Sequence, residues 1–196
     1  MNEFIKNTIL YLLPFFFYLI IHYLFDPYNY HNHNYVPKEI KNNISKKIGT
    51  HLYKIIDYQN NPKKNIVLGD SRSNRLFINI KAKKESWGEL SYGAASLNEV
   101  LNTLNWLLNE EYELDTVLIG VNFNLYNKLN KRDWVENTLN KKRNMISIAF
   151  SLHSFQSIFE ILKYYTFKTP LDIGKPKISK EQFLQNQLNF YSKKFY

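Results

Sequence analysis

The 196-residue chain contains no cysteine. This absence excludes disulfide bonds, catalysis by a thiolate and zinc held by cysteine, and it is compatible with an oxidising compartment without indicating one. The chain also lacks internal repeats and low-complexity tracts, and 44% of its residues are hydrophobic. That composition excludes a disordered or collagen-like chain. The length is that of one domain together with an accessory segment.

Acidic residues are scarce beside basic ones, 17 against 26, which leaves a formal net charge of +9. A surplus of this kind attracts anionic partners. The chain carries no recognisable RNA- or DNA-binding signature, so we expect no nucleic-acid partner. A solvated face, or attraction to anionic lipid or to a wall polymer, better explains the basic stretch over residues 163–196.

A long apolar run covers residues 4–25 and is interrupted mainly by Pro14 and by polar residues near its ends. About 20 helical residues match a hydrocarbon core of roughly 30 Å, and membrane helices tolerate proline. No small-residue cleavage site follows the run, which disfavours a signal peptide. We therefore expect residues 1–25 to form one uncleaved transmembrane helix; a signal peptide and a buried core helix are the alternatives.

The charges that flank the run indicate its orientation. Lys6 precedes it, and residues 26–37 contain no lysine or arginine. The positive-inside rule then favours an internal N-terminus, although Lys38 and Lys41 farther along oppose this orientation. We expect a single-pass protein of the cell membrane with its domain on the extracytoplasmic side.

Residues 26–37 form a polar, aromatic spacer, and residues 38–196 carry the patterns of a folded domain. Residues 38–59 have one apolar stripe at helical spacing, which predicts a single helix that ends at Asn60-Asn61-Pro62. Short apolar runs at residues 65–69 and 115–121 predict strands, the second being central and covered on both faces. Residues 87–92 predict a weaker strand.

The clearest helix covers residues 96–110. Ser96 and Glu99 match a capping box. Apolar residues then follow on one predicted face: Leu97, Val100, Leu101, Leu104, Leu107 and Leu108. Residues 145–167 form a further apolar stretch that we expect to be helical. The alternation of strands and helices predicts an α/β fold with a parallel sheet.

Three short motifs follow the predicted strands: Gly69-Asp70-Ser71, Gly93 within SYGAAS, and Gly120-Val121-Asn122. Parallel strands end at one edge of a sheet, where open α/β folds bind ligands. A serine at a strand-to-helix turn projects its hydroxyl above the sheet, with its own N–H near a helix N-terminus. The Gly93 N–H and the Asn122 amide can donate to the same developing oxyanion, and one such donor contributes about 3 kcal/mol.

In this order the motifs resemble those of the SGNH (GDSL-like) hydrolase superfamily, over roughly residues 65–124. The resemblance implies a three-layer α/β/α sandwich with a parallel sheet, as in flavodoxin-like folds. It also implies that Ser71 is the nucleophile and that Gly93 and Asn122 complete the oxyanion hole.

With the anchor, the chain is most similar to the membrane-tethered branch that includes the D-alanyl-transfer protein of teichoic acid synthesis and the O-acetylation proteins of exopolysaccharides. This implies a serine esterase or O-acyltransferase that uses no cofactor and no metal. The substrate would be an envelope polysaccharide or another acylated polymer, and a membrane-bound acyl-donor protein is a further partner.

The D-x-x-H motif that supplies the family's acid and base has no match here, and His153 is the only histidine after Ser71. Without a base, serine is a poor nucleophile. Three explanations stay open. The chain is a piece of a longer protein, incomplete at the C-terminus; it is an inactive relative that acts as a membrane-tethered binding or scaffold module; or His153 serves as the base.

Plain structural roles also stay open for these residues. We expect Asp70 to cap the following helix instead of taking part in catalysis. His31 and His33 have no carboxylate pattern nearby, so they do not predict a metal site. The other plain roles are a turn or helix cap for Ser71, a strand end for Asn122, solvated surface for Arg72 and Arg75, and a half-buried helix position for His153.

Overall fold

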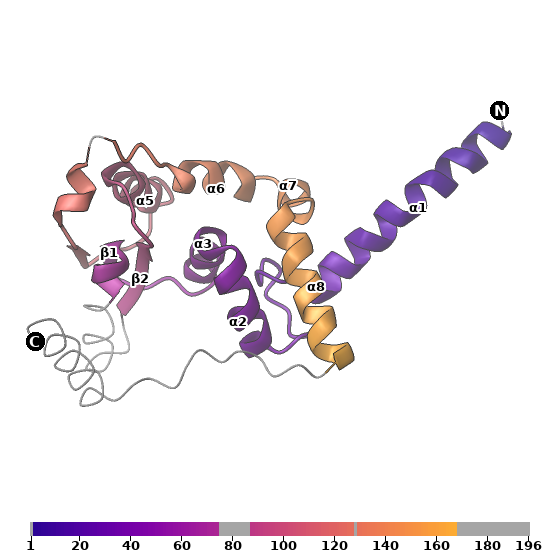
Figure 1. Cartoon of the computed structure of the whole chain (residues 1–196), viewed down its shortest axis with the longest axis horizontal. Coiled ribbons are helices and arrows are strands. Elements are labelled where there is room, and N and C mark those ends of the chain that lie inside the picture. The colour runs from indigo at the N-terminus through magenta and orange to yellow at the C-terminus, as the bar shows by residue number, and fades with distance from the viewer. Residues whose placement is uncertain (1, 75–86, 128, 168–196) are drawn as a thin grey trace, which may run out of the picture.

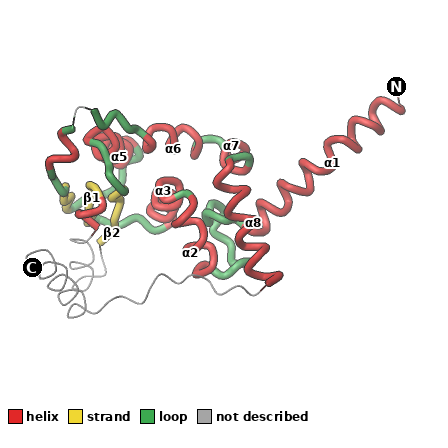
Figure 2. Tube along the Cα trace, viewed as in Figure 1, coloured by secondary structure: helices red, strands yellow, loops and turns green. Residues whose placement is uncertain are grey.

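The computed structural model describes residues 2–74, 87–127 and 129–167. Over these residues the protein is a mixed α/β fold with a parallel sheet, as predicted, and an N-terminal apolar helix. The strands lie together at one end, and helices form the rest of the molecule (Figure 2). The basic stretch beyond residue 167 and Arg75 lie outside the described residues. The elements are α1 (Asn2–Phe25), α2 (Lys38–Ile48), α3 (Thr50–Asn60), β1 (Asn65–Asp70), β2 (Trp87–Tyr92), α5 (Leu97–Asn109), β3 (Thr116–Ile119), the 3₁₀ turn η1 (Phe123–Tyr126), α6 (Trp134–Lys142), α7 (Met145–Ala149) and α8 (Leu152–Phe167).

The sheet has the strand order β2-β1-β3, with both pairings parallel. Strand β1 is in the middle, and its apolar residues Ile66, Val67 and Leu68 are completely buried. Among the described residues β3 pairs only with β1, and its Ile119 is 41% exposed. The prediction of a central strand covered on both faces is therefore wrong for β3 in this part of the chain, because an apolar run alone does not distinguish a middle strand from an edge strand.

One hydrophobic cluster joins the sheet to three helices. Alternate residues of a strand face the same side of the sheet, and Ile66 and Leu68 of β1 accordingly share this cluster with Leu90 and Tyr92 of β2. The helical members of the cluster come from α3, α5 and α6: Ile55, Tyr58, Val100, Trp106, Leu107 and Val135. These three helices therefore belong to the layer that covers this face.

Helix α5 begins with the predicted capping box. The Ser96 hydroxyl accepts the Glu99 N–H at 3.1 Å, and the Glu99 carboxylate accepts the Ser96 N–H at 3.0 Å. The predicted apolar face is wrong in part, because Leu101 and Leu108 are exposed. The residues buried on α5 are instead Glu99, Val100, Thr103, Trp106 and Leu107. The large Trp106 ring packs against Tyr58 and Tyr112, and the Glu99 carboxylate has hydrogen-bond partners in the interior.

The single helix predicted for residues 38–59 is two helices that meet at Gly49. Tyr28, which is 1% exposed, packs against the break. A Cβ atom at Gly49 would lie 2.5 Å from the Tyr28 hydroxyl oxygen. Helical periodicity continues through the break, so the apolar pattern did not reveal it.

The spacer of residues 26–37 is packed against the domain. The Asp26 carboxylate accepts the Tyr30 N–H at 2.6 Å and lies 3.8 Å from the Lys41 amine, and both of these charged side chains are buried. Lys41 also donates to the Asn29 side chain and to the His33 carbonyl, each at 2.7 Å. These partners satisfy the buried ammonium and hold the spacer on α2.

The apolar segment Glu3–Phe25 of α1 is long and apolar enough to cross a membrane, and only 6% of its most apolar window is buried. The helix projects away from the rest of the molecule, with the N-terminus at its far end (Figure 1). Toward the C-terminal end of α1, Tyr18 stacks on Phe155 of α8 with ring centroids 4.3 Å apart.

The helical prediction for residues 145–167 is confirmed, with a break between α7 and α8.

Candidate functional site

The structure places the three sequence motifs at the carboxyl ends of adjacent strands. Asp70 ends β1 and pairs with Tyr92 of β2, so Ser71 and Gly93 follow at neighbouring positions of this edge. On the other side of β1, Leu68 pairs with Ile119, and Gly120 leads to Asn122. Since β1 lies between β2 and β3, Ser71 lies between the segments that carry Gly93 and Asn122.

Ser71 is exposed and begins a helical segment that is described as far as residue 74. The Asp70 carboxylate is buried and accepts the N–H of Arg72 at 2.9 Å. Asp70 therefore caps this segment, as predicted. Arg72 is exposed, in agreement with its interpretation as surface charge.

A serine that the sequence analysis did not single out, Ser73, packs inside the strand-to-helix turn. Ser73 is buried, and a Cβ atom at either Gly69 or Gly120 would clash with its side chain. Gly69 also has φ +140°, a conformation that favours glycine. The two glycines therefore let the turn approach both β1 and β3, while Ser71 faces outward. The signal was present in the sequence as a serine two residues after Ser71.

Gly93 and Asn122 flank this turn with different surroundings. A Cβ atom at Gly93 would meet nothing within 4 Å, so open space lies beside this residue. Its carbonyl accepts a hydrogen bond from the Arg132 guanidinium at 3.1 Å. Asn122 is half-buried directly before η1, and its carbonyl accepts the Leu125 N–H at 3.1 Å.

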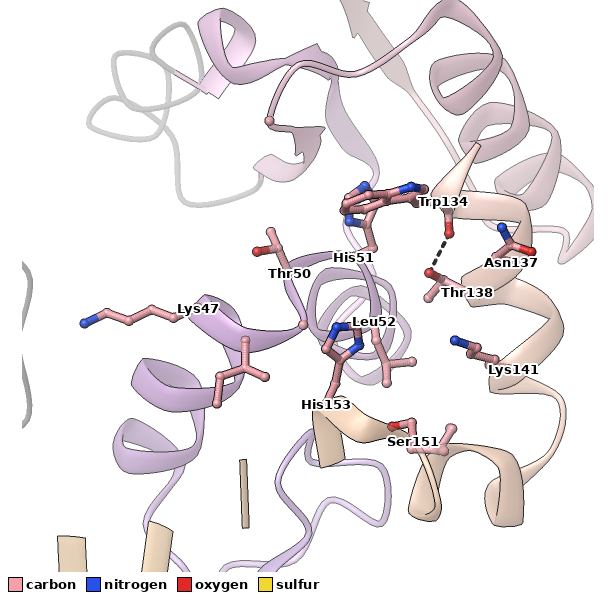
Figure 3. Close-up of a pocket in the computed structure, with 14 residues that line it drawn as sticks. Lys47, Thr50, His51, Leu52, Trp134, Asn137, Thr138, Lys141, Ser151 and His153 are labelled. Atoms are coloured by element: carbon pink, nitrogen blue, oxygen red, sulfur yellow. Dashed lines mark hydrogen bonds between the residues drawn. The ribbon is translucent and has the colours of Figure 1, made fainter. Parts of the chain in front are cut away.

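A cavity of about 650 Å³ opens beside Gly93 (Figure 3). Helices α3, α6 and α8 contribute to its wall, and Figure 3 shows the side chains of His51, Trp134, Lys141 and His153 around it. The full lining is Lys47, Ile48, Gly49, Thr50, His51, Leu52, Gly93, Trp134, Asn137, Thr138, Lys141, Ile148, Ser151 and His153. The cavity thus brings His153 and Gly93 to one space, whereas Ser71 is not among the residues that line it.

His51 is the cavity residue that sequence reasoning missed. Its imidazole stacks on Tyr92 with ring centroids 4.3 Å apart, and its Nε2 lies 3.4 Å from the Glu99 carboxylate. Glu99 is completely buried and also accepts the Trp134 N–H at 3.1 Å. The search for a histidine after Ser71 could not find His51, which precedes it. The sequence feature that could have pointed to His51 is Glu99, because an acidic side chain that faces the core from a capping box needs polar partners.

The pKa values of Glu99 and His153 are both lowered, for different reasons. Burial raises the pKa of Glu99, but the contact with His51 and the N–H groups of Ser96 and Trp134 outweigh it, so the pKa lies below the ordinary value. Burial lowers the pKa of His153, and the charges of Lys141 and His51 lower it further. His153 is therefore neutral at neutral pH, the form that a general base requires.

The described residues contain no group of three or more His, Asp or Glu side chains placed to hold a metal ion. His31 and His33 stack at 6.1 Å, and both lie against Tyr23 of α1, at 4.9 and 5.1 Å. The rings around His31 and His33 are thus aromatic side chains.

Neither a protein-family model, nor a curated protein sequence, nor a solved structure matches this chain.

Proposed function

We propose that this chain is a membrane-anchored, SGNH-like serine esterase or O-acyltransferase that acts on acylated polymers of the cell envelope. The observation that carries the proposal is the position of Ser71, on a tight turn after the middle strand, between the segments that hold Gly93 and Asn122. An oxyanion hole needs donors aimed at the developing oxyanion, and the strand order supports this role because it brings the segments of Gly93 and Asn122 to the same edge as Ser71. The three-layer sandwich is part of the same proposal.

In the proposed reaction the Ser71 oxygen attacks the carbonyl carbon of an acyl ester. The Ser71 and Gly93 N–H groups and the Asn122 amide stabilise the oxyanion. A base takes the serine proton and returns it to the leaving sugar oxygen, which leaves an acyl-serine. Water or an acceptor hydroxyl then attacks this acyl-serine and regenerates Ser71. Among the described residues His153 remains the candidate for the base, since it is neutral and shares a cavity with Gly93.

The proposal places α1 across the cell membrane with the domain on the extracytoplasmic side. The length and hydropathy of α1 support the span. Lys6 before it and the absence of lysine and arginine from residues 26–37 support the orientation. This location would bring the domain to envelope polymers and to a membrane-bound acyl donor.

A fluorophosphonate probe tests the nucleophile directly, because it reacts covalently with an activated serine. We expect the full chain in detergent or in nanodiscs to be labelled, and the Ser71→Ala variant to lose the label. Ser147→Ala, which removes a half-buried hydroxyl at α7, is the matched control and should be labelled like the wild type. Equal labelling of the wild type and Ser71→Ala would overturn the assignment of Ser71.

The second candidate is a non-catalytic, membrane-tethered module that binds a glycan or serves as a scaffold. One observation favours it: over the described residues, no hydrogen bond links the Ser71 hydroxyl to a histidine, and Ser71 does not line the cavity of His153. Under this candidate the folded wild type resists the probe and still binds the polymer.

A further inference from the structure

The cavity beside Gly93 carries an exposed tryptophan in its wall. Trp134 is 54% exposed, whereas Trp106 of α5 is 6% exposed. The Trp134 ring is nevertheless held in place: the Arg132 guanidinium lies over it at 4.3 Å, and the His51 imidazole meets it in a T-shaped contact at 5.5 Å. Burial of a tryptophan side chain stabilises a fold, so a ring that is fixed and yet exposed in a cavity offers its surface to a ligand.

Hydrogen-bonding side chains accompany this ring on the same face of α6. Four residues of the helix line the cavity at helical spacing: Trp134, Asn137, Thr138 and Lys141. The Asn137 amide donates its N–H to the Asp133 carbonyl at 3.1 Å, which leaves the side-chain oxygen as an acceptor. The Thr138 hydroxyl donates to the Trp134 carbonyl at 2.6 Å, so its oxygen is also an acceptor (Figure 3). One aromatic surface and several polar groups therefore line the same space.

His51 adds an acceptor whose orientation is fixed from the interior. Its Nε2 atom is buried and lies 3.4 Å from the Glu99 carboxylate. Glu99 is itself completely buried and is held by the N–H groups of Ser96 and Trp134. A carboxylate beside Nε2 favours the tautomer with the proton on that nitrogen, which leaves Nδ1 as an acceptor in the neutral imidazole. Nδ1 is therefore the ring nitrogen that can serve a ligand in the cavity.

We propose that this cavity binds a neutral sugar residue, which stacks on Trp134 and forms hydrogen bonds with His51 and Asn137. The C–H groups on the face of a sugar ring are apolar and slightly positive, which suits the negative face of an indole. The hydroxyls around the rim both donate and accept, as the groups beside Trp134 do. An apolar ligand would leave those polar groups without partners, and a small ion would make no use of the ring. The volume of about 650 Å³ lies within the ordinary range of small-molecule sites.

The role of this site in the reaction rests on the proposed function. Gly93 belongs both to the cavity wall and to the edge of the sheet that carries Ser71. A polymer with one sugar in the cavity would therefore extend toward Ser71 with a neighbouring, acylated sugar. The cavity would then be the subsite that selects a glycan. Sugar binding by itself does not require Ser71 to be a nucleophile.

NMR of the full chain tests the site, in dodecylphosphocholine micelles because this detergent contains no sugar. The ligands are N,N′-diacetylchitobiose and maltose, titrated separately. The chain has three tryptophans, and Trp87 and Trp106 are internal references because they do not line the cavity. We expect at least one disaccharide to shift the resonances of the Trp134 indole and the His51 imidazole in a saturable manner and to leave the references unchanged.

Two variants remove one contact each. Trp134→Ala should weaken sugar binding, measured at His51, roughly fivefold, because the stacking contact is lost. Asn137→Ala should weaken it roughly threefold, as expected for one hydrogen bond, and leaves the ring in place. The matched controls are Phe123→Ala, which removes a 95% exposed ring outside the cavity, and Asn140→Ala, which removes an exposed amide of α6 outside it. Both controls should bind like the wild type.

The proposal is overturned if neither disaccharide gives saturable shifts, if all three tryptophans shift alike, or if Trp134→Ala and Asn137→Ala both bind as the wild type does. Adenosine, a flat aromatic ligand, is titrated in parallel, and binding of adenosine without either disaccharide would also overturn it. Fluorophosphonate labelling separates this site from the reaction. Sugar binding by a wild type that resists the fluorophosphonate would support the site and refute the esterase, whereas labelling at Ser71 without sugar binding would refute the site alone.

Discussion

Glu99 is a single residue on which the geometry beside the proposed site depends. It caps α5 through the Ser96 N–H, holds the start of α6 through the Trp134 N–H and contacts His51 of α3. These partners keep its pKa below the ordinary value despite the opposing effect of burial. A carboxyl whose pKa is lower in the folded than in the unfolded state stabilises the fold at neutral pH, and this stabilisation is lost as the pH falls through the folded pKa.

We expect Glu99→Gln to lower the free energy of unfolding by about 1–3 kcal/mol at neutral pH, because the buried N–H groups lose a charged acceptor. The difference from the wild type should shrink as the pH falls below the ordinary pKa of a glutamate, since Glu99 then takes up a proton first in the unfolded chain and, below its folded pKa, in the native protein as well. Urea unfolding followed over a series of pH values measures both effects. Glu136→Gln, at an exposed position, is the control and should follow the wild type. A Glu99→Gln deficit that does not change with pH would contradict the charged role.

Between elements, the break between α2 and α3 positions the α3 end of the cavity. At Gly49 the chain has φ −131° and ψ 62°, outside the helical region. Tyr28 fills the space beside the glycine, and burial raises the pKa of its hydroxyl to about 12. The spacer thus packs one buried ring, that of Tyr28, against the break between the two helices.

We expect Gly49→Ala to destabilise the protein by about 1–3 kcal/mol, although alanine is the better helix former, because its Cβ would overlap the Tyr28 hydroxyl. The matched control is Gly93→Ala, whose Cβ would meet open space and should leave the unfolding free energy within about 0.5 kcal/mol of the wild type. Thermal or chemical unfolding compares the two. Removal of the hydroxyl in Tyr28→Phe should recover part of the loss in the double variant; no recovery would place the strain elsewhere.

Across the whole molecule, α8 connects the domain to the apolar helix α1. One side of α8 is buried, with Ser154, Ile158 and Ile161. A second side is apolar yet exposed: Leu152, Phe155, Phe159 and Leu162. Phe155 stacks on Tyr18, seven residues before the end of α1. At helical rise this contact lies roughly 10 Å inside the end of the helix. If α1 spans the bilayer as proposed, the exposed apolar side of α8 reaches the lipid.

Single-cysteine variants test this geometry without other changes, since the chain has no cysteine of its own. We expect a nitroxide at Phe159→Cys, in the full chain in nanodiscs, to be accessible to molecular oxygen and shielded from a water-soluble nickel complex. A nitroxide at Gln156→Cys, on the exposed polar side of the same helix, should show the reverse. Access of the nickel complex to both positions would contradict contact with lipid. Shielding of position 159 from both reagents would instead indicate a protein partner.

Local sequence patterns predicted much of this architecture. The capping box of Ser96 and Glu99, the bounds of β2 and the extent of α1 agree closely with the sequence, because each depends on residues within one element. The alignment of Ser71, Gly93 and Asn122 at one edge also followed from the sequence, since parallel strands that end in these motifs must share an edge. Their chemical roles stay predictions.

Tertiary structure alone decided the rest. The amino-acid sequence predicted most of the helices and strands, because backbone hydrogen bonds and apolar periodicity act over a few residues, but it predicted neither α6 nor the break at Gly49. It did not reveal that Tyr28 separates α2 from α3, or that His51, Glu99 and Trp134 meet beside Gly93. Trp134 donates its N–H to a carboxylate 35 residues away. Such contacts form only when packing brings distant segments together, and the cavity beside the sheet exists because several of these contacts coincide.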